Sequence, residues 1–328
     1  MTDRVRIGVI GAGIMGQRLL DAARLHAEDV VEIAGVWDPD PAAMARVAGF
    51  ATPCADADAL IEAADCVYIA SPPSSHLSHA RTALEAGRAV LLEKPLAIDL
   101  QEARAFVDEH GTDRVAVNFP MASSPAVARL AQWIAEGAVG RPDRVAIEVA
   151  FAAWPRAWQH GAASWLDGRA QGGFVREVVS HFLFLTGRLL GPVALRDGAV
   201  TFAPGASERL AVARFRAGGV EGVPGTLHGE VGATEADDKN RWTLDGPAGS
   251  VRLRDWSVAE RRAPGVAADT AWDTDPDALP NPQMRPLVLR RQLEGVVRLT
   301  LGEPHALATL AEALAVQEVV EALLQREA

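Results

Sequence analysis

The chain has 328 residues and a formal net charge of -11, and 49% of its residues are hydrophobic and 23% charged. These proportions are typical of a globular protein rather than a disordered one, and the length exceeds the usual size of one hydrophobic core, so we expect two domains. A surface this acidic repels nucleic acid and anionic lipid, which argues against both as partners.

The two cysteines, Cys54 and Cys66, are too few for a disulfide framework, and neither lies near a His or Cys pair with the spacing of a zinc site. We therefore expect neither disulfides nor a bound metal. No run of about 18 apolar residues is present that would span a membrane, and the first residues enter a strand pattern without a signal-peptide cleavage site. These features predict a cytoplasmic protein.

The first third of the chain alternates short apolar runs with segments of helical periodicity. The strand-like runs cover residues 5–10, 30–37, 66–70, 89–92 and 115–117, and helical segments cover 15–25, 74–86 and 100–110. Parallel strands need crossover connections of this length, which are usually helices. The pattern predicts an α/β Rossmann domain with a doubly wound parallel sheet over residues 1–120.

After about residue 120 the pattern changes. Helical stretches are expected at 125–136 and 171–190, and strands at 143–150, 198–202, 210–215, 226–231, 241–244 and 250–253. Short strands separated by turn residues favour an antiparallel sheet. We therefore predict that residues 121–328 form an α+β domain with a large, mainly antiparallel sheet, which binds substrate and mediates oligomerisation.

The last part of the chain is predicted to be irregular and then helical. Residues 257–283, rich in Ala, Pro and Asp, are expected to be an irregular connection, and helices are expected at 285–301 and 306–326. The closing helix is a candidate for packing back on the first domain.

A glycine-rich loop, Gly11-Ala12-Gly13-Ile14-Met15-Gly16, joins the first strand to the first helix. In a Gly-x-Gly-x-x-Gly loop the first glycine permits the tight turn, the second lets the backbone approach a pyrophosphate, and the third allows close helix packing. The helix N-terminus offers unpaired N–H groups to the phosphates. Such a loop can also be a mere tight turn, but its position after the first strand favours a dinucleotide site.

Asp38 follows the second strand, where the adenosine ribose of a dinucleotide would lie. A carboxylate there accepts hydrogen bonds from the ribose hydroxyls and repels a 2′-phosphate, and no Arg or Lys in residues 37–40 could bind one. We therefore predict NAD as the cofactor, in preference to NADP. The alternative is that Asp38 caps the next helix, although Asp40 and Pro41 form the better cap and first-turn pair.

Three segments resemble motifs of a known family. Ser71-Pro72-Pro73-Ser74-Ser75-His76, Ala83-Leu84-Glu85-Ala86-Gly87 and Glu93-Lys94-Pro95-Leu96 are similar to segments of the glucose–fructose oxidoreductase/inositol dehydrogenase (Gfo/Idh/MocA) family, and the similarity covers nearly the whole chain. The resemblance implies a nicotinamide-dependent oxidoreductase. Together with the glycine loop, it predicts cofactor contacts from Gly11, Gly13, Ile14, Met15, Gly16, Asp38, Ser71, Pro72, His76, Glu93 and Lys94.

Lys94 is the first candidate for catalysis. Hydride transfer between an alcohol and NAD leaves an alkoxide-like oxygen, and a lysine at the carboxyl end of a sheet strand can donate or accept the proton there. The resemblance implies that Lys94 does so, that Glu93 orients or tunes it, and that Pro95 follows a cis bond. The alternative is a surface ion pair, which would contribute little.

Glu177 and His181 are the second constellation. On an α-helix two residues four apart share one face, so the carboxylate could hold the imidazole in one tautomer while the ring binds or protonates a substrate oxygen. We therefore predict Lys94, His181 and Glu177 as the catalytic set, with a buried core histidine as the alternative. The family usually has Asp and Gly where this chain has Glu177 and Val179, which argues against an ordinary polyol pose.

Substrate contacts are predicted for Lys94, Asn118, Trp154, Trp165, Glu177 and His181. The family commonly places basic or aromatic residues just after Asn118, but here only the aromatic Phe119 follows, which indicates a less anionic or differently shaped substrate. Three arginines could compensate, namely Arg156, Arg169 and Arg176. The indole faces of Trp154, Trp158 and Trp165 suit sugar surfaces, and packing explains them equally well.

The leading hypothesis is reversible hydride transfer between nicotinamide and a sugar, cyclic polyol or related carbonyl substrate. A second is reduction of an imine or a conjugated bond. A third is a non-catalytic, cofactor-sensing regulator, against which Lys94 and His181 argue because a sensor need not keep proton-transfer groups. If the open face of the second sheet is apolar it needs a cover, so we expect a homodimer or homotetramer.

Overall fold

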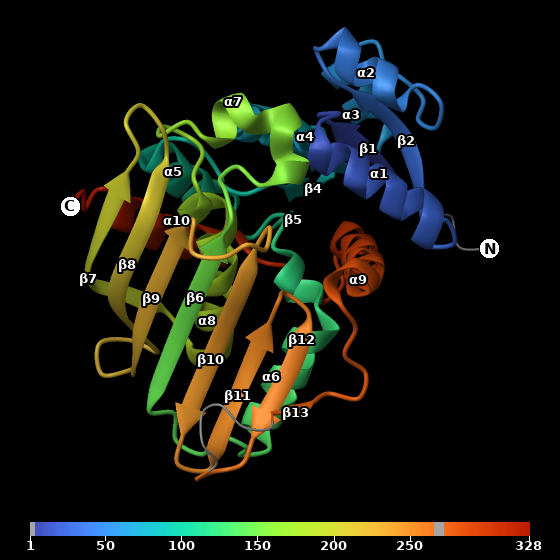
Figure 1. Ribbon diagram of the computed structural model, residues 1–328. Coiled ribbons are helices and arrows are strands. Elements are labelled where there is room, and N and C mark those ends of the chain that lie inside the picture. Colours follow the sequence, from blue (N-terminus) through green and yellow to red (C-terminus); the bar gives the residue numbers. More distant parts are fainter. Residues whose placement is uncertain (1–3, 266–271) are drawn as a thin grey trace. The chain divides into compact units, whose positions relative to one another are not determined.

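The computed structural model describes residues 4–265 and 272–328 (Figure 1). The chain divides into two compact units. The first comprises Met1–Ser123 with Arg285–Leu314, and the second comprises Ser124–Met284 with Ala315–Ala328. Most of helix α9 (Asn281–Leu301) therefore belongs to the first unit, although it follows the whole second sheet in the sequence, and helix α10 (Leu310–Leu324) is divided between the two.

The first unit is built on a five-stranded parallel sheet in the order β2-β1-β3-β4-β5. Its strands are β1 (Val5–Ile10), β2 (Val31–Trp37), β3 (Cys66–Ile69), β4 (Ala89–Leu92) and β5 (Val115–Val117), and its longer connecting helices are α1 (Ile14–His26), α4 (His76–Glu85) and α5 (Leu100–His110). The predicted Rossmann domain is confirmed, because each of these elements lies where the periodicity placed it.

Two short helices between β2 and β3, α2 (Pro41–Val47) and α3 (Ala57–Ala63), are not predicted by the periodicity. Asp40 caps α2, its Oδ1 accepting a hydrogen bond from the Ala42 N–H at 2.9 Å, and Pro41 lies in the first turn. The capping residue is thus Asp40 and not Asp38, which leaves Asp38 for another role.

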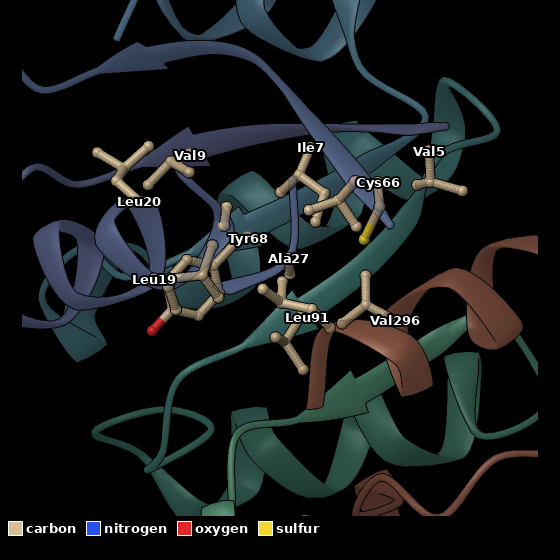
Figure 2. Close-up of a cluster of buried hydrophobic side chains, with 14 of the residues drawn as sticks. Val5, Ile7, Val9, Leu19, Leu20, Ala27, Cys66, Tyr68, Leu91 and Val296 are labelled. Carbon is tan, nitrogen blue, oxygen red and sulfur yellow. The ribbon is translucent and has the colours of Figure 1, made fainter. Parts of the chain in front are cut away.

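Apolar side chains of the sheet pack against α1 and α9 in the core of the first unit (Figure 2). Leu91 lies there beside Val296 of α9, and Ile7 belongs to the same buried cluster. Parallel strands are covered on both faces, which explains the continuous apolar runs that predicted them. Cys66 belongs to this core, and burial raises the pKa of its thiol to about 12, so it is an inert apolar residue.

Among the described residues, eight strands form the sheet of the second unit, in the order β13-β12-β11-β10-β6-β9-β8-β7 (Figure 1). They are β6 (Arg144–Phe151), β7 (Val193–Phe202), β8 (Glu208–Ala217), β9 (Val223–Val231), β10 (Lys239–Gly246), β11 (Gly249–Arg254), β12 (Val258–Arg262) and β13 (Asp273–Thr274). Neighbouring strands are antiparallel except for β6 and β9, which are parallel. The mainly antiparallel sheet is therefore confirmed.

The prediction of an irregular connection over residues 257–283 is wrong in part. Strands β12 and β13 lie within it, and only residues 266–271 of this stretch are outside the described part of the chain. The sequence of β12, Val258-Ala259-Glu260-Arg261-Arg262, shows no clean alternation of apolar and polar residues. Its strand conformation depends on pairing with β11, where Glu260 lies opposite Arg252.

Helices α6 (Pro125–Ala135) and α8 (Ser180–Leu190) lie against one face of this sheet (Figure 1). On the covered face Trp242 of β10 is fully buried, and its indole Nε1–H donates to Oγ1 of Thr186 on α8 at 2.9 Å. A buried indole N–H needs such an acceptor, so this hydrogen bond fixes α8 against the middle of the sheet.

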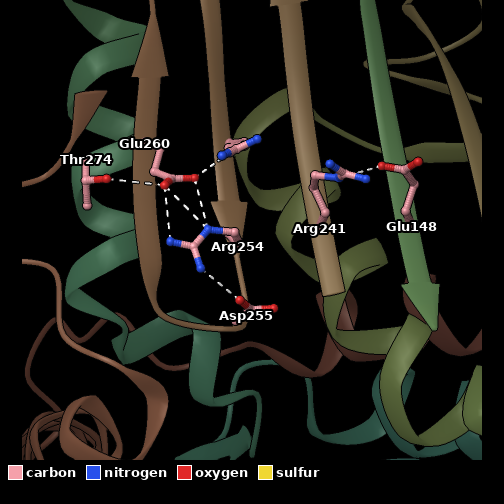
Figure 3. Close-up of polar contacts among 7 residues, drawn as sticks. Glu148, Arg241, Arg254, Asp255, Glu260 and Thr274 are labelled. Carbon is pink, nitrogen blue, oxygen red and sulfur yellow. Dashed lines mark hydrogen bonds and ion pairs between the residues drawn. The ribbon is translucent and has the colours of Figure 1, made fainter. Parts of the chain in front are cut away.

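The opposite face of the sheet carries paired charges (Figure 3). Arg241 of β10 binds Glu148 of β6 at 2.7 Å, and Arg252 and Arg254 of β11 both bind Glu260 of β12. Burial raises the pKa of Glu260, but hydrogen bonds from the two arginines outweigh burial and lower it overall. The condition behind the expected oligomer, an apolar open face, is not met by these strands, and the oligomeric state stays a prediction.

The hydrogen bond between Trp242 and Thr186 predicts a stability effect. Thr186→Val keeps the shape of the side chain but leaves the indole N–H buried without an acceptor, so we expect the free energy of unfolding to fall by about 1–3 kcal/mol. Urea denaturation followed by tryptophan fluorescence measures it. Thr201→Val, at an exposed position of β7, is the control and should change stability by no more than about 0.5 kcal/mol. Equal losses in both variants would contradict the assignment.

Candidate active site

Two glycines of the loop after β1 are required by contacts within the first unit. Gly11 has a φ of +100°, and a Cβ at this position would lie 2.6 Å from the carbonyl of Ala70 at the end of β3. A Cβ on Gly16 would lie 1.8 Å from the carbonyl oxygen of Gly11. These glycines let the loop turn tightly and let α1 pack closely on it.

Gly13 differs from both of them. Its φ of -72° is ordinary, and a Cβ there would meet no atom of the described residues within 4 Å. The packing of the protein therefore does not explain this glycine. Open space beside the backbone at a helix N-terminus is what the pyrophosphate of a dinucleotide requires, so the loop fits that ligand.

The sheet order places this loop at a topological switch point. β1 and β3 are neighbours in the sheet, and the chain leaves β1 toward β2 on one side but leaves β3 toward β4 on the other. Ligands of open α/β sheets bind at the carboxyl ends of the strands at such a point. The close approach of Gly11 to Ala70 and Ser71 brings the predicted cofactor residues after β1 and β3 together.

Asp38 is tied to the same loop. Its Oδ2 accepts a hydrogen bond from the Ala12 N–H at 2.7 Å, and its Oδ1 accepts one from the Asp40 N–H at 2.8 Å. Each carboxylate oxygen can accept a further hydrogen bond, and the residue is partly exposed. The geometry therefore fits a carboxylate that contacts a ribose beside the pyrophosphate.

His76, predicted to contact the cofactor, is only 1% exposed. Its Nε2 lies 2.7 Å from the carbonyl oxygen of Ser71, and its Nδ1 lies 2.9 Å from that of Pro95. Burial lowers the pKa of His76 although both carbonyls favour its charged form. The prediction of a direct cofactor contact is therefore corrected: the ring links the loops after β3 and β4. The Lys94–Pro95 peptide, which lies in the loop after β4, is cis, as the resemblance implies.

Glu93 directly follows β4 and is 7% exposed, which contradicts a surface ion pair with Lys94. Its Oε1 accepts hydrogen bonds from the Tyr68 hydroxyl and from Asn118 Nδ2, the latter at 2.6 Å. Lys94 follows, partly exposed, at the carboxyl end of the strand. The pair thus combines a fixed internal carboxylate with a lysine at the ligand-binding edge of the sheet.

Asn118, predicted to bind substrate, is 3% exposed and engaged at both ends of its amide. Nδ2 donates to Glu93, and Oδ1 accepts from Nε2 of Gln292 on α9 at 2.8 Å. The structure corrects the prediction, because the side chain is part of an internal network. Tyr68 and Gln292 are site residues that the sequence motifs miss. Tyr68 lies in an apolar run, and Gln292 comes from a helix with no motif.

In the second unit, Glu177 lies in a π-helical turn over Val175–Val179, and His181 lies in the first turn of α8. π-helical turns are frequent at functional sites, and they change the spacing that an α-helical pattern assumes. Glu177 and His181 therefore do not lie on one continuous α-helix, as the prediction assumes. The His181 ring is partly buried and lies edge-on to Trp256, with ring centroids 5.6 Å apart.

Glu208 of β8 holds the start of the π-helical turn and is not predicted by any motif. It is fully buried, and its Oε1 accepts a hydrogen bond from the Val175 N–H at 2.6 Å. Burial raises the pKa of this carboxyl. A Cβ on Gly173 would lie 2.2 Å from its Oε2, and a Cβ on Gly172 would lie 2.1 Å from the Leu166 carbonyl oxygen, which explains the glycine pair before this turn.

The predicted substrate tryptophans differ in burial. Trp154 is 6% exposed, packs edge-on against Phe151 and Phe174, and donates from Nε1 to the Leu166 carbonyl at 3.2 Å. The packing alternative is correct for Trp154. Trp165, in α7 (Ala163–Leu166), is 43% exposed and stays a candidate for ligand contact.

The three arginines that could compensate for the missing basic residue after Asn118 are all ion-paired. Arg156 binds Asp238, Arg169 binds Glu327 and Arg176 binds Glu321. Arg156 is also buried between Trp154 and Trp158, with 5.5 and 4.7 Å from its guanidinium carbon to the two ring centroids. These contacts give each arginine a role within the second unit.

In the described part of the chain, no group of three or more His, Cys, Asp or Glu residues is arranged to hold a metal ion. None of the helices described is both long enough and apolar enough to cross a membrane. The fold and the loop together define a protein with a dinucleotide-binding Rossmann domain and an appended, mainly antiparallel sheet domain.

Comparison with known proteins agrees with this class. Residues 5–119 match the model of a family described as "Oxidoreductase family, NAD-binding Rossmann fold". This match to the Gfo/Idh/MocA model covers the Rossmann domain, which is less than half of the chain.

Curated relatives match over part of their length. A UDP-N-acetylglucosamine 3-dehydrogenase of Acidithiobacillus ferrooxidans is 36% identical over 31% of this chain and 32% of its own length. An inositol 2-dehydrogenase of Saccharopolyspora erythraea is 34% identical over 43% of this chain and 44% of its own length. The chain thus matches less than half of the length of these relatives. A solved levoglucosan dehydrogenase in complex with NADH has the same fold, with a TM-score of 0.83, 19% identity and coverage of 99% of this chain and 97% of that one.

The environment of Tyr68, the single tyrosine of the chain, predicts an alkaline titration. Burial and, next, the charge of Glu93 raise its pKa well above the ordinary value. We expect no tyrosinate absorbance from the folded protein as the pH rises through about 10. Because the folded state keeps this proton longer than the unfolded state, the stabilisation is complete below the unfolded pKa of about 10 and falls as the pH rises above it.

Absorbance and circular dichroism recorded together during the titration test this expectation. Tyrosinate should appear only with loss of the folded signal. Ionisation near the ordinary pKa with the fold intact would show that Tyr68 is not the buried donor to Glu93.

Proposed function

We propose that the protein is an NAD(P)-dependent oxidoreductase that transfers hydride between nicotinamide and a sugar, cyclic polyol or related carbonyl substrate. The observation that carries the proposal is the arrangement at the carboxyl ends of the first sheet. A glycine loop with open space at Gly13 follows β1, and Lys94 follows β4, which is separated from β1 by β3 alone. The names of the relatives, which are dehydrogenases of sugars and an inositol, support the substrate class.

The bound dinucleotide would supply the hydride acceptor or donor. On this proposal the N–H groups at the start of α1 bind the pyrophosphate, and Gly13 lets the backbone approach it. Asp38 accepts hydrogen bonds from the adenosine ribose. Lys94 Nζ gives or takes the proton of the substrate oxygen, which prevents the build-up of charge there.

For the second unit we keep His181 and Glu177 as the proposed substrate-contacting pair. A partly buried imidazole in the first turn of α8 can donate to or accept from a substrate oxygen, and Glu208 fixes the turn that carries Glu177. Trp165 is the exposed aromatic residue proposed to contact the substrate.

We also propose a cytoplasmic homodimer or homotetramer that acts on a small molecule. The net charge of -11 and the free thiols of Cys54 and Cys66 support the location. Because the open sheet face carries paired charges, apolar burial on this face would not be enough to form an oligomer. The mass of the protein in solution tests the oligomeric state.

The cofactor proposal predicts a preference and a separation of two glycine variants. NADH should bind more tightly than NADPH, because Asp38 would repel the 2′-phosphate. Gly13→Ala should weaken NADH binding at least about tenfold with little loss of stability, since its Cβ meets nothing within the protein.

Calorimetric titration with NADH and NADPH, with thermal unfolding of each variant, measures both effects. Gly16→Ala is the contrasting variant, because its Cβ would clash with the Gly11 carbonyl and should destabilise the unit itself. Tighter binding of NADPH than NADH would contradict the role of Asp38. Unaltered NADH affinity in Gly13→Ala would contradict the placement of the pyrophosphate.

The catalytic proposal predicts the effect of removing Lys94. Lys94→Ala should lower kcat by about 10²–10⁴-fold, the usual contribution of a general acid or base, while NADH affinity stays close to that of the wild type. NADH absorbance with a panel of sugars, inositols, cyclic ketones and imines provides the assay.

Lys239→Ala, which removes the only other lysine of the chain from an exposed position, is the matched control and should keep full activity. Unchanged turnover in Lys94→Ala would exclude the lysine as the proton-transfer group. Tight NADH binding with no turnover of any panel member would favour the cofactor-sensing regulator instead.

A further inference from the structure

A chain of buried hydrogen bonds runs from α9 to the residue before Lys94. Gln292 Nε2 donates to Asn118 Oδ1 at 2.8 Å, Asn118 Nδ2 donates to Glu93 Oε1 at 2.6 Å, and the Tyr68 hydroxyl donates to the same carboxylate oxygen. All four side chains are at most 7% exposed. Gln292 and Asn118 are 174 residues apart in the sequence.

The direction of this chain is set by its chemistry. An ionised Glu93 only accepts hydrogen bonds, so the Asn118 amide must turn its NH₂ group toward the carboxylate. Its Oδ1 then faces Gln292, which must present its own NH₂ group. Gln292 Oε1 is buried and has no hydrogen-bond partner among the described residues. Gln292 therefore takes part in this series of hydrogen bonds only as a donor.

Packing alone does not explain this set of residues. Polar groups cost free energy to bury unless they are fully hydrogen-bonded, and apolar side chains could fill the same space. The hydrogen bonds nevertheless connect side chains from β3, from the residue after β5 and from α9 to one carboxylate. Backbone hydrogen bonds also fix the main chain here. The Glu93 N–H donates to the Ile69 carbonyl oxygen at 2.9 Å, and the Asn118 N–H donates to the Leu92 carbonyl oxygen at 2.6 Å.

We propose that Tyr68, Asn118 and Gln292 are positioning residues that fix the Glu93 carboxylate and, through it, the orientation of Lys94. Gln292 has a particular part in this arrangement, since its donor group decides which end of the Asn118 amide faces Glu93. Helix α9, although far from Lys94 in the sequence, thereby affects the orientation of the Lys94 side chain. The inference rests on the proposed role of Lys94 in proton transfer.

Gln292→Glu tests the direction of the chain. The introduced carboxylate has no donor when it is ionised, so it draws the NH₂ group of Asn118 to itself and turns Oδ1 toward Glu93, which loses one of its donors. When the new carboxyl is protonated at low pH, its O–H can again donate to Asn118 Oδ1. The variant should therefore be defective above the pKa of the new carboxyl, which burial raises, and recover below that pKa. Gln292→Leu has neither donor nor proton, so its defect should not depend on pH.

The composition of the chain provides readouts that do not need activity. Tyr68 is the only tyrosine, and Lys94 and Lys239 are the only lysines. Protein labelled with ¹³C at the tyrosine Cζ and the lysine Cε therefore gives one tyrosine and two lysine resonances, with exposed Lys239 as the internal reference. Comparison with the wild type at each pH removes the titration of neighbouring groups, which are Glu93, Tyr68 and, through its charge, Arg18.

We expect Gln292→Glu to shift the Tyr68 and Lys94 resonances above the pKa of the new carboxyl, to return both toward their wild-type positions below it, and to leave Lys239 unchanged. kcat should fall by about tenfold or more above that pKa, as for a misplaced catalytic group, while the KM for NADH stays close to the wild-type value. Gln283→Glu, the same change at an exposed position of α9, is the matched control and should shift neither resonance.

The outcomes separate this inference from the proposed function. If the wild type binds NADH but turns over no substrate, the proposed function fails, and the resonances still test the positioning. Tyr68 and Lys94 signals that stay unmoved at every pH in folded Gln292→Glu, and also in folded Gln292→Leu, would overturn the inference. A shift of Tyr68 without Lys94 would overturn the link to the lysine. Should Gln292→Glu not fold, Tyr68→Phe removes one donor to Glu93 and must shift the Lys94 resonance.

Discussion

The burial of the Glu93 carboxylate is the constraint on which the candidate site depends. A carboxylate that is 7% exposed is costly unless donors surround it. The donors here come from β3 and from the residue after β5, and α9 orients one of them. The carboxyl ends of three neighbouring strands are therefore held by one side chain. Lys94 and the cis peptide to Pro95 come directly after Glu93 in the sequence.

The second unit also contains a buried carboxylate that accepts a hydrogen bond near a candidate site residue. Glu208 is a fully buried carboxylate whose oxygen accepts the Val175 N–H at the start of the π-helical turn. The turn interrupts the regular helical ladder directly before His181, and a regular α-helix would place Glu177 and His181 differently. In both units, a buried carboxylate accepts hydrogen bonds close in the sequence to a partly exposed titratable residue, Lys94 or His181.

The parts of the fold that the sequence predicts are those with local signals. The strand, glycine loop and helix at the N-terminus follow from residues within one stretch, and the parallel sheet follows from its repetition. β12 could not be predicted, because its charged residues become intelligible only beside Arg252 and Arg254 of the neighbouring strand.

The site residues divide in the same way. Gly13, Asp38 and Lys94 lie at ends of elements that the sequence reveals. Asn118 is among the predicted substrate contacts, and the sequence gives no sign of its hydrogen bond to Gln292, which lies 174 residues away. Gln292 itself lies in a helix whose pattern has no distinguishing feature.

The basic residues of this chain give a separate reason to assign chemistry to Lys94. Thirty of its thirty-two basic residues are arginines, so the surface and the ion pairs of the second unit use guanidinium groups almost throughout. Arginine binds carboxylates in a planar, bidentate manner but does not release its proton at the pH values of a cell. A residue that must give and take a proton therefore cannot be an arginine. Of the two lysines, Lys239 lies exposed on β10, and Lys94 lies at the ligand-binding edge of the Rossmann sheet. The residue type at position 94 is thus one that can give and take a proton, in a chain whose basic residues are otherwise almost all arginines.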